Sequence, residues 1–311
     1  MERDKGKSRK SIIIIVILLL SSAVLGYFTV NSYFKYKNLL SQNNKLSNKL
    51  NTLKEENVNF NRIKEDYTNE ENGLNNLDSE LANLKEEVFS LASKLEEKIL
   101  AGDTDYKIAY ITFDDGPYHS TNDVIEILDN YKVKATFFTI GLDKDICYDN
   151  SNYSCAEMYK KEVEHGHTIA NHTYTHLIFR GLYNSTSSFI NDVKRQEAMI
   201  EERTGVKTNI VRFPGGSATA GNLKNSIINE LRNMGYGWVD WTAGDGDGGY
   251  VANTTVAWNN LTRQIDENIE VILFHDYSRI TISILPQAIE YLEEKNYILL
   301  PLFYESVKVN K

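Results

Sequence analysis

The stretch "AYITFDDGPY", residues 109–118, decides the fold, because an apolar strand ends there in two adjacent carboxylates and a turn. Tyr110, Ile111 and Phe113 are typical of a β-strand, and Gly116-Pro117 is a strong turn signal. A carboxylate at the end of a buried strand needs a partner. In a solvated turn, by contrast, Asp is common for backbone reasons alone. This stretch by itself leaves both interpretations open.

Strand-like and helix-like runs alternate around and after this stretch. The pattern begins with "YKIAYITF", "STNDVIEILDNYK" and "KATFFTI" and continues to "EVILFHD" and "ISILPQAIEYLEEKNY". Strands that alternate with helices indicate an α/β fold with a mostly parallel sheet, either open or closed into a barrel.

The N-terminal region predicts a membrane anchor. Residues 12–30 carry no charge, and at about 1.5 Å per residue a helix of this length nearly spans the hydrocarbon core. Basic residues crowd the side before Ile12, so the positive-inside rule places residues 1–11 in the cytoplasm and the rest outside. The alternative is a cleaved signal peptide, but the apolar run is long for one and lacks a clean A-x-A site.

A coiled-coil stalk is predicted between the anchor and the α/β region. Apolar residues from Leu74 to Leu95 recur with alternating spacings of three and four, and residues 31–103 contain no Pro. Such a seam predicts a homodimer, although the same stripe could pack a single helix against the globular domain. The segment "AGDTDYK" (101–107) is the expected linker.

Charge and cysteine content narrow the possible partners. The net charge of −9 argues against nucleic acid, because phosphate binding needs a basic face. Cys147 and Cys155 are the two cysteines, and no CxxC pair exists for a thiolate metal site. Outside the membrane they are candidates for a disulfide, and two free thiols are the alternative.

Two histidine-bearing stretches carry residues suited to catalysis. "GHTIANHTYTH" places His172 and His176 four residues apart, and on a helix this spacing stacks both imidazoles on one face, as a metal site requires. "VILFHDYS" ends an apolar strand on His275, and strand ends are where α/β enzymes place their chemistry. The ordinary structural alternatives are a surface pair and a capped strand.

A third stretch, "VRFPGGS", puts Arg212 beside a turn whose backbone N–H groups could face an oxyanion. In chain order, Asp-Asp-Gly-Pro, His-x-x-x-His, Arg-x-Pro-Gly, Asp-Trp and Leu-x-His resemble the motifs of the polysaccharide deacetylases of carbohydrate esterase family four, the NodB-like domains. The resemblance covers residues 104–305, the region after the stalk. It implies a distorted (β/α) barrel with one divalent metal, usually Zn²⁺, with Co²⁺ or another divalent ion as the alternative.

Carried over by position, the resemblance makes Asp115, His172 and His176 the metal ligands. It makes Asp114 the general base on water at the metal, and Arg212 the partner that keeps Asp114 ionised. On this assignment one acid is committed to the metal while its neighbour stays free.

The remaining roles also follow from the resemblance. The backbone N–H after Pro214 stabilises the oxyanion, Trp241 and Leu273 line the acetyl pocket, and His275 protonates the departing amine. Gly215 stands where the family commonly carries Tyr, which removes an aromatic contact to the sugar. An acid of the fourth motif tunes His275, and Asp240, Asp245 and Asp247 compete for this role, with Asp247 preferred.

These inferences define four regions: a cytoplasmic tail (1–11), an anchor (12–30), a stalk with linker (31–103) and a catalytic domain (104–311). The expected activity is metal-dependent hydrolysis of N-acetyl groups on a cell-wall glycan, with peptidoglycan N-acetylglucosamine as the first substrate. The alternatives are a deacetylase of another surface polysaccharide or chitooligosaccharide, and a stalked scaffold that only binds glycan.

Overall fold

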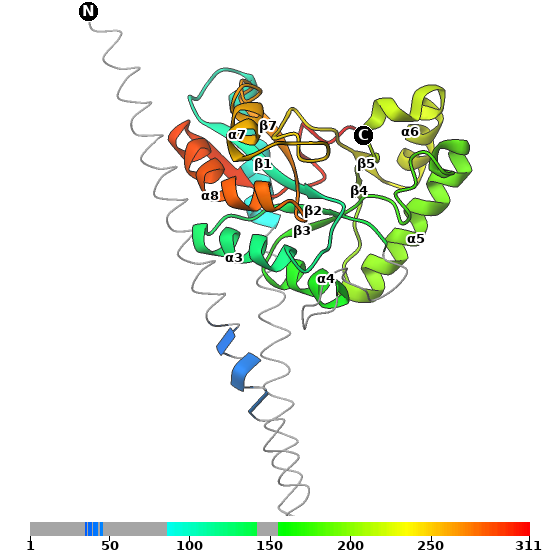
Figure 1. Ribbon diagram of the computed structural model, residues 1–311, viewed down its shortest axis with the longest axis horizontal. Coiled ribbons are helices and arrows are strands. Elements are labelled where there is room, and N and C mark those ends of the chain that lie inside the picture. The colour runs from blue at the N-terminus through cyan, green and yellow to red at the C-terminus, as the bar shows by residue number, and fades with distance from the viewer. Residues whose placement is uncertain (1–34, 36, 39, 43, 46–85, 142–154) are drawn as a thin grey trace, which may run out of the picture. The chain divides into compact units, whose positions relative to one another are not determined.

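The structure is a computed structural model that describes residues 35, 37–38, 40–42, 44–45, 86–141 and 155–311 (Figure 1). The chain divides into two compact units, Met1–Leu91 and Ala92–Lys311. In the first unit the described residues between 35 and 45 and those from 86 onward are helical. The strands described here all lie in the second unit.

Several sequence predictions fall outside the described residues. They are the anchor (12–30), most of the stalk and Cys147, so the proposed disulfide also lies outside. Within the described part of the chain, no helix combines the length and the apolar character needed to cross a bilayer.

A single sheet of eight parallel strands forms the centre of the second unit, in the order β5-β4-β3-β2-β1-β7-β6, with β8 also paired to β1. The strands are Lys107–Asp114 (β1), Thr136–Thr139 (β2), Thr168–Asn171 (β3), Ile210–Val211 (β4), Gly237–Trp238 (β5), Ala243–Gly244 (β6), Ile269–His275 (β7) and Tyr297–Leu300 (β8). Among the described residues no ladder joins β5 to β6, so the sheet is a curled half-barrel. The predicted α/β fold with a parallel sheet is confirmed.

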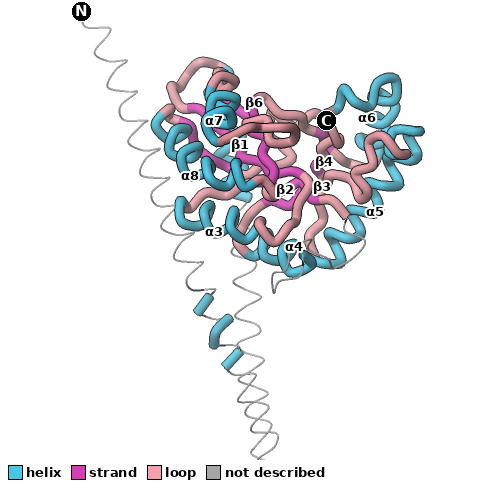
Figure 2. The backbone as a smooth tube through the Cα atoms, in the orientation of Figure 1, coloured by secondary structure: helices cyan, strands magenta, loops and turns pink. Residues whose placement is uncertain are grey.

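Helices surround the strands, as the tube in Figure 2 shows. They are Thr121–Tyr131 (α3), Cys155–Glu164 (α4), Thr186–Thr204 (α5), Lys224–Asn233 (α6), Thr254–Thr262 (α7) and Arg279–Glu294 (α8), with short 3₁₀ turns at Leu182–Asn184 (η1) and Ser217–Leu223 (η2). The main core packs β1 and β7 against α3 and α8 through buried apolar residues such as Phe113, Leu128 and Phe274. Burial of these side chains is the principal stabilising contribution.

The register of the sheet brings distant motifs together. β1 and β7 pair over their whole length, and Asp114 stands directly opposite His275 at their carboxyl ends. Elsewhere in the sheet, Asn171 at the end of β3 stands opposite Val211 of β4. The residues that follow them, His172 and Arg212, therefore lie side by side. Parallel strands therefore deliver all of these residues to one edge of the sheet, the usual position of sites in α/β proteins.

The helix of residues 86–100 ends within the second unit. Ala92, Glu96 and Ile99 are buried, and the Glu96 carboxylate accepts hydrogen bonds from Tyr110 Oη at 2.7 Å and Ser306 Oγ at 2.6 Å. Residues 92–99, which the sequence analysis assigned to the stalk, therefore pack as part of the compact unit.

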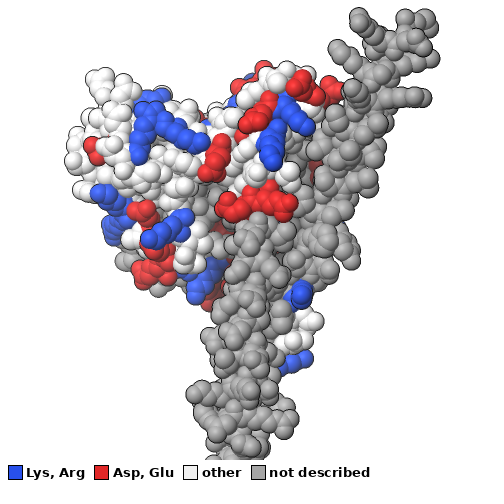
Figure 3. Space-filling view, turned by 180° about the vertical axis from the view of Figure 1, so that it is seen from behind, with Lys and Arg blue, Asp and Glu red and all other residues white. Residues whose placement is uncertain are grey.

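Charges of both signs are mixed on the face shown in Figure 3. Lys and Arg side chains alternate there with Asp and Glu, so neither sign dominates this face of the described residues.

Candidate active site

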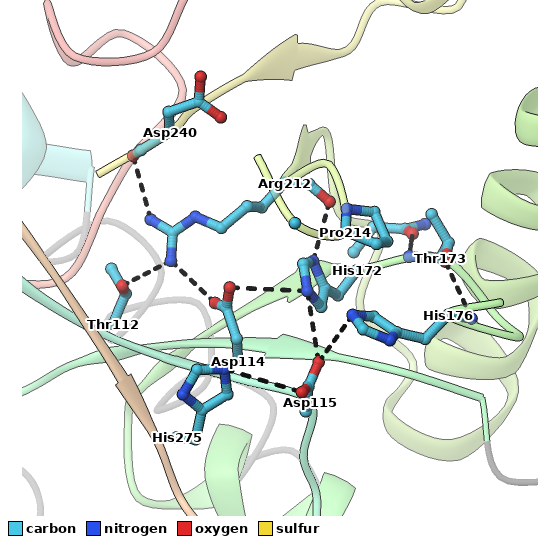
Figure 4. Close-up of polar contacts among 12 residues, drawn as sticks. Thr112, Asp114, Asp115, His172, Thr173, His176, Arg212, Pro214, Asp240 and His275 are labelled. Carbon is cyan, nitrogen blue, oxygen red and sulfur yellow. Dashed lines mark hydrogen bonds and ion pairs between the residues drawn. The ribbon is translucent and has the colours of Figure 1, made fainter. Parts of the chain in front are cut away.

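The two adjacent carboxylates at the end of β1 face different partners (Figure 4). Asp114 is almost fully buried, and its Oδ1 accepts a hydrogen bond of 2.8 Å from Nη1 of the buried Arg212. The same nitrogen lies 2.7 Å from Thr112 Oγ1, and the guanidinium lies over the ring of Phe138 at 4.1 Å. Asp114 thus has the buried cationic partner that an ionised buried carboxylate requires.

Asp115 turns away from that ion pair. Its φ of 69° lies in the left-handed region, which Asp tolerates better than most residues. Oδ1 lies 3.1 Å from Nε2 of His176 and 3.4 Å from Nε2 of His172, and Oδ2 lies 3.7 Å from Nε2 of His275. Burial opposes the charge, but the hydrogen bond and charge of His172, followed by the other two imidazoles, lower the pKa of Asp115 to about 2. The carboxylate is therefore ionised.

His172 and His176 lie in the loop after β3, so the predicted helical stacking of the pair is wrong. Their rings nevertheless meet, with centroids 5.0 Å apart. Thr173 and His176 both take left-handed backbone angles, with φ of 66° and 50°, and Asn171 Oδ1 accepts the Thr173 N–H at 2.9 Å. This hydrogen-bonded loop, rather than helical periodicity, brings the two rings together.

The Asp115, His172 and His176 side chains fit a divalent cation. Their ligand atoms all lie within 4.8 Å of one another. His172 Nδ1 donates to the Arg212 carbonyl at 2.9 Å, which leaves the lone pair on Nε2 facing the site. Burial lowers the pKa of His176, which favours its neutral form, and the buried Asp115 Oδ1 faces the Nε2 atoms of both histidines. One carboxylate and two imidazoles are the donor set of many catalytic zinc sites.

His275 forms a second, separate pair with Asp247. Nδ1 of His275 lies 2.7 Å from Asp247 Oδ1, and its backbone N–H donates to Oδ2 at 2.9 Å. Burial disfavours the imidazolium, but the hydrogen bond and charge of Asp247, and then the charges of Asp114 and Asp115, raise the pKa of His275 to about 9. Nε2 is left facing Asp115. This arrangement can hold a proton at Nε2 and release it.

The sequence left three acids, Asp240, Asp245 and Asp247, as candidates for the residue that tunes His275, and they occupy different positions. Asp247 contacts His275 directly, whereas Asp245 contacts Asp247, whose backbone N–H donates to Asp245 Oδ1 at 3.1 Å. Thr281 Oγ1 lies 2.7 Å from Asp245 Oδ2 and also contacts Asp247. Burial and the charge of Asp247 raise the pKa of Asp245, so Asp245 carries the proton of this pair. Asp240 instead accepts from the backbone and hydroxyl of Ser217.

The residues expected to contact substrate lie close to the Asp114–Arg212 pair. Leu273, half-buried, pairs with Thr112 across β7 and β1. Trp241 is 37% exposed, with its ring 6.0 Å from the Arg212 guanidinium. Gly215 has a φ of 73°, which favours glycine, and its amide has no acceptor among the described residues.

Sequence reasoning missed two supporting residues, Asn171 and Thr281. Asn171 is buried, donates to the Val193 carbonyl at 2.9 Å and holds the histidine loop. Thr281 bridges the two acids behind His275. An Asn just before the first histidine was a visible signal, but nothing in the sequence linked Thr281 to an acid far upstream.

Several known proteins are similar to this chain in sequence and fold. Residues 101–239 match the family model described as polysaccharide deacetylase. A peptidoglycan-N-acetylglucosamine deacetylase of Bacillus cereus is 30% identical over 197 residues, which cover 61% of this chain and 67% of that protein. A putative polysaccharide deacetylase of Bacillus subtilis is 30% identical over 212 residues, covering 67% of this chain and 70% of its own length.

A solved structure shares the fold. The catalytic domain of a peptidoglycan N-acetylglucosamine deacetylase from Eubacterium rectale superposes with a TM-score of 0.59 and 29% identity, covering 66% of this chain and 92% of that one. The family model match ends before Asp247 and His275. The pairing of β1 with β7 places His275 beside the carboxylates, and the pairing of β6 with β7 brings the loop of Asp247 to His275.

Proposed function

This chain belongs to the polysaccharide deacetylase family, and on that basis we propose that it hydrolyses N-acetyl groups of amino sugars in a cell-surface glycan and releases acetate. The observation that carries the proposal is the division of labour between Asp114 and Asp115. Asp114 pairs with Arg212, and Asp115 faces the Nε2 atoms of two histidines.

Asp115, His172 and His176 would hold the divalent cation, with Zn²⁺ preferred for this donor set. A cation bound there supplies Lewis acidity that polarises the amide carbonyl and makes a water molecule more acidic.

Two protein groups move the protons. Asp114 is the general base that accepts a proton from the attacking water, and Arg212, 2.8 Å away, orients its carboxylate for that step. His275 is the general acid that gives its Nε2 proton to the departing amine. Asp247 is a positioning residue that fixes the ring and favours the protonated form. The proton taken by one group and the proton given by the other balance over the reaction.

Contacts to the acetyl group come from the neighbouring loops and strands. The free amide at Gly215 donates to the oxyanion, and Trp241 with Leu273 forms the wall against which the methyl group packs. These contacts position the carbonyl carbon for attack.

Peptidoglycan N-acetylglucosamine is the proposed substrate. The support comes from the activity of the similar proteins and from an uncharged run at residues 12–30 preceded by basic residues. We place residues 1–11 in the cytoplasm, and a dimerising stalk that begins at residue 31 and ends before Ala92 carries the compact catalytic unit outside the membrane.

The direct test is acetate release by the purified full-length protein from peptidoglycan and from an N-acetylglucosamine oligomer, with mass spectrometry of the products. We expect a loss of one acetyl group at N-acetylglucosamine units. Activity should disappear with a chelator and return with Zn²⁺. A metal-loaded protein that releases no acetate from any N-acetylated glycan would overturn the enzymatic proposal in favour of a glycan-binding scaffold.

A further inference from the structure

The turn that follows His176 places an unusual group of side chains beside the candidate metal site. Leu177, Ile178 and Phe179 are three consecutive apolar residues, and Leu177 and Phe179 are 45% and 96% exposed. Runs of apolar residues at the surface are unfavourable unless they serve a function. Together with His176 and Arg180 they line a pocket of about 300 Å³, at the lower end of small-molecule sites.

The turn is held in place by hydrogen bonds rather than by its apolar side chains. The carbonyl of Leu177 accepts both the Arg180 N–H at 3.1 Å and the Leu182 N–H at 3.2 Å. Before the turn, Thr175 N–H donates to Asp192 Oδ2 of α5 at 2.8 Å. Phe179 is therefore presented to solvent by a pre-ordered backbone.

The same turn adjoins the loop that carries the candidate oxyanion donor. A Cβ at Gly215 would lie only 3.3 Å from Cδ1 of Ile178, and Tyr183 Oη donates to the Pro214 carbonyl at 2.8 Å. Ile178 thus occupies the space next to Gly215 that a side chain at that position would need. The apolar surface that Gly215 cannot supply is supplied by the turn.

Arg180 adds a charge to this surface. Its side chain is exposed, and no carboxylate among the described residues pairs with it. A free guanidinium next to an exposed aromatic ring is suited to a ligand that combines an apolar ring face with a carboxylate.

We propose that residues 177–180 form a subsite for the sugar next to the one that is deacetylated. Phe179 stacks on that sugar's apolar face, and Arg180 pairs with a carboxylate it carries. The proposal rests on the deacetylase function above and adds to it a preference for acidic glycans over neutral ones. A pure N-acetylglucosamine polymer offers only the apolar ring face, whereas the glycan strands of peptidoglycan offer a ring face and a carboxylate.

The test compares Phe179→Ala, Phe179→Trp and Arg180→Gln in the full-length protein, with Leu100→Ala, another exposed apolar position, as the control. The substrates are chitotetraose, peptide-free glycan strands with lactyl carboxylates, and strands that keep their peptide stems. We expect Phe179→Ala to raise KM about tenfold on all three, the equivalent of about 1.4 kcal/mol of ring contact, with little change in kcat. Phe179→Trp should keep the wild-type KM.

Arg180→Gln should raise KM about threefold, and only on the carboxylate-bearing strands. An effect on the peptide-free strands identifies the lactyl carboxylate, and an effect confined to stem-bearing strands identifies a peptide carboxylate. An equal effect on chitotetraose would overturn the charge assignment. Wild-type KM values for Phe179→Ala would overturn the subsite.

Binding of the fully deacetylated tetramer, measured by calorimetry, separates this proposal from the proposed function because it needs no turnover. Weaker binding to Phe179→Ala would support the subsite even if the wild-type protein released no acetate. Unchanged binding would contradict it even in an active enzyme.

Discussion

The backbone carbonyl of Arg212 accepts a hydrogen bond of 2.9 Å from Nδ1 of His172. The guanidinium of the same residue holds Asp114 at 2.8 Å. One residue therefore orients a candidate metal ligand through its main chain and a candidate base through its side chain. Because the two contacts use different parts of Arg212, the metal site and the base can be tested separately.

Asp114→Asn is expected to retain the metal, because Asp115 and both histidines remain. The amide cannot accept the water proton, so the rate of acetate release should fall by about 10²–10⁴-fold. Metal content and acetate release, measured on the same preparation, check this. Acetate release at the wild-type rate would show that the roles of the two acids are wrongly assigned.

His176→Ala is expected to lose both metal and activity, since two remaining ligands hold a cation weakly. His165→Ala is the matched control, because His165 pairs with Asp129 outside the site. Elemental analysis after dialysis should find metal in the control and little in His176→Ala. Equal metal content in the two variants would rule out the proposed ligand set.

Asp247→Asn is expected to slow the reaction by about 10²-fold, because His275 loses the partner that orients it. The charge of Asp247 raises the pKa of His275, so its removal lowers that pKa, and the alkaline decline of the rate should move to lower pH. Asp245→Asn removes an acid whose pKa burial and the charge of Asp247 raise to about 7, so it should slow the reaction less than Asp247→Asn does. Rate–pH profiles of the two variants make the comparison, and identical profiles would contradict the assignment of Asp247.

Glu162→Gln is expected to stabilise the protein at neutral pH. Glu162 is fully buried with both carboxylate oxygens unpartnered in the described chain, and burial, then the charge of Asp276, raises its pKa well above 4.5. Above the ordinary pKa of a glutamate, Glu162 loses its proton in the unfolded chain but keeps it in the folded protein. The free energy of unfolding therefore falls as the pH rises above that ordinary pKa.

Glu162→Gln has no carboxyl group to ionise and so lacks this pH-dependent loss of stability. The difference in stability between the variant and wild type should therefore grow between pH 4 and pH 8. At pH 8 it should reach at least about 2 °C in Tm, roughly 1 kcal/mol in a domain of this size. Glu164→Gln, exposed on the same helix, should change Tm little at either pH. A pH-independent difference between wild type and Glu162→Gln would contradict the buried neutral acid.

A domain that begins at residue 92 is expected to be more stable than one that begins at residue 104. The shorter chain lacks Glu96, which leaves the buried Tyr110 hydroxyl without its acceptor at a cost of about 1–3 kcal/mol. Urea denaturation of the two chains measures the difference. Equal midpoints would show that residues 92–99 are dispensable.

The sequence by itself determined the fold class and nominated the candidate site residues. Alternating strand and helix patterns predicted the parallel sheet, and paired motifs in a fixed order nominated Asp114, Asp115, His172, His176 and His275. These signals are local, because each depends on a short run of residues. They also use the rule that functional residues of α/β proteins lie at the carboxyl ends of strands.

Only the tertiary structure decided how these residues meet. The helical pairing expected for His172 and His176 gave way to a loop with left-handed residues, because the strand before them ends at Asn171. The choice among three acids depended on which one the β6–α7 loop carries to His275, a contact between residues 28 positions apart. Such contacts are set by strand register and packing, and spacing along the chain does not encode them.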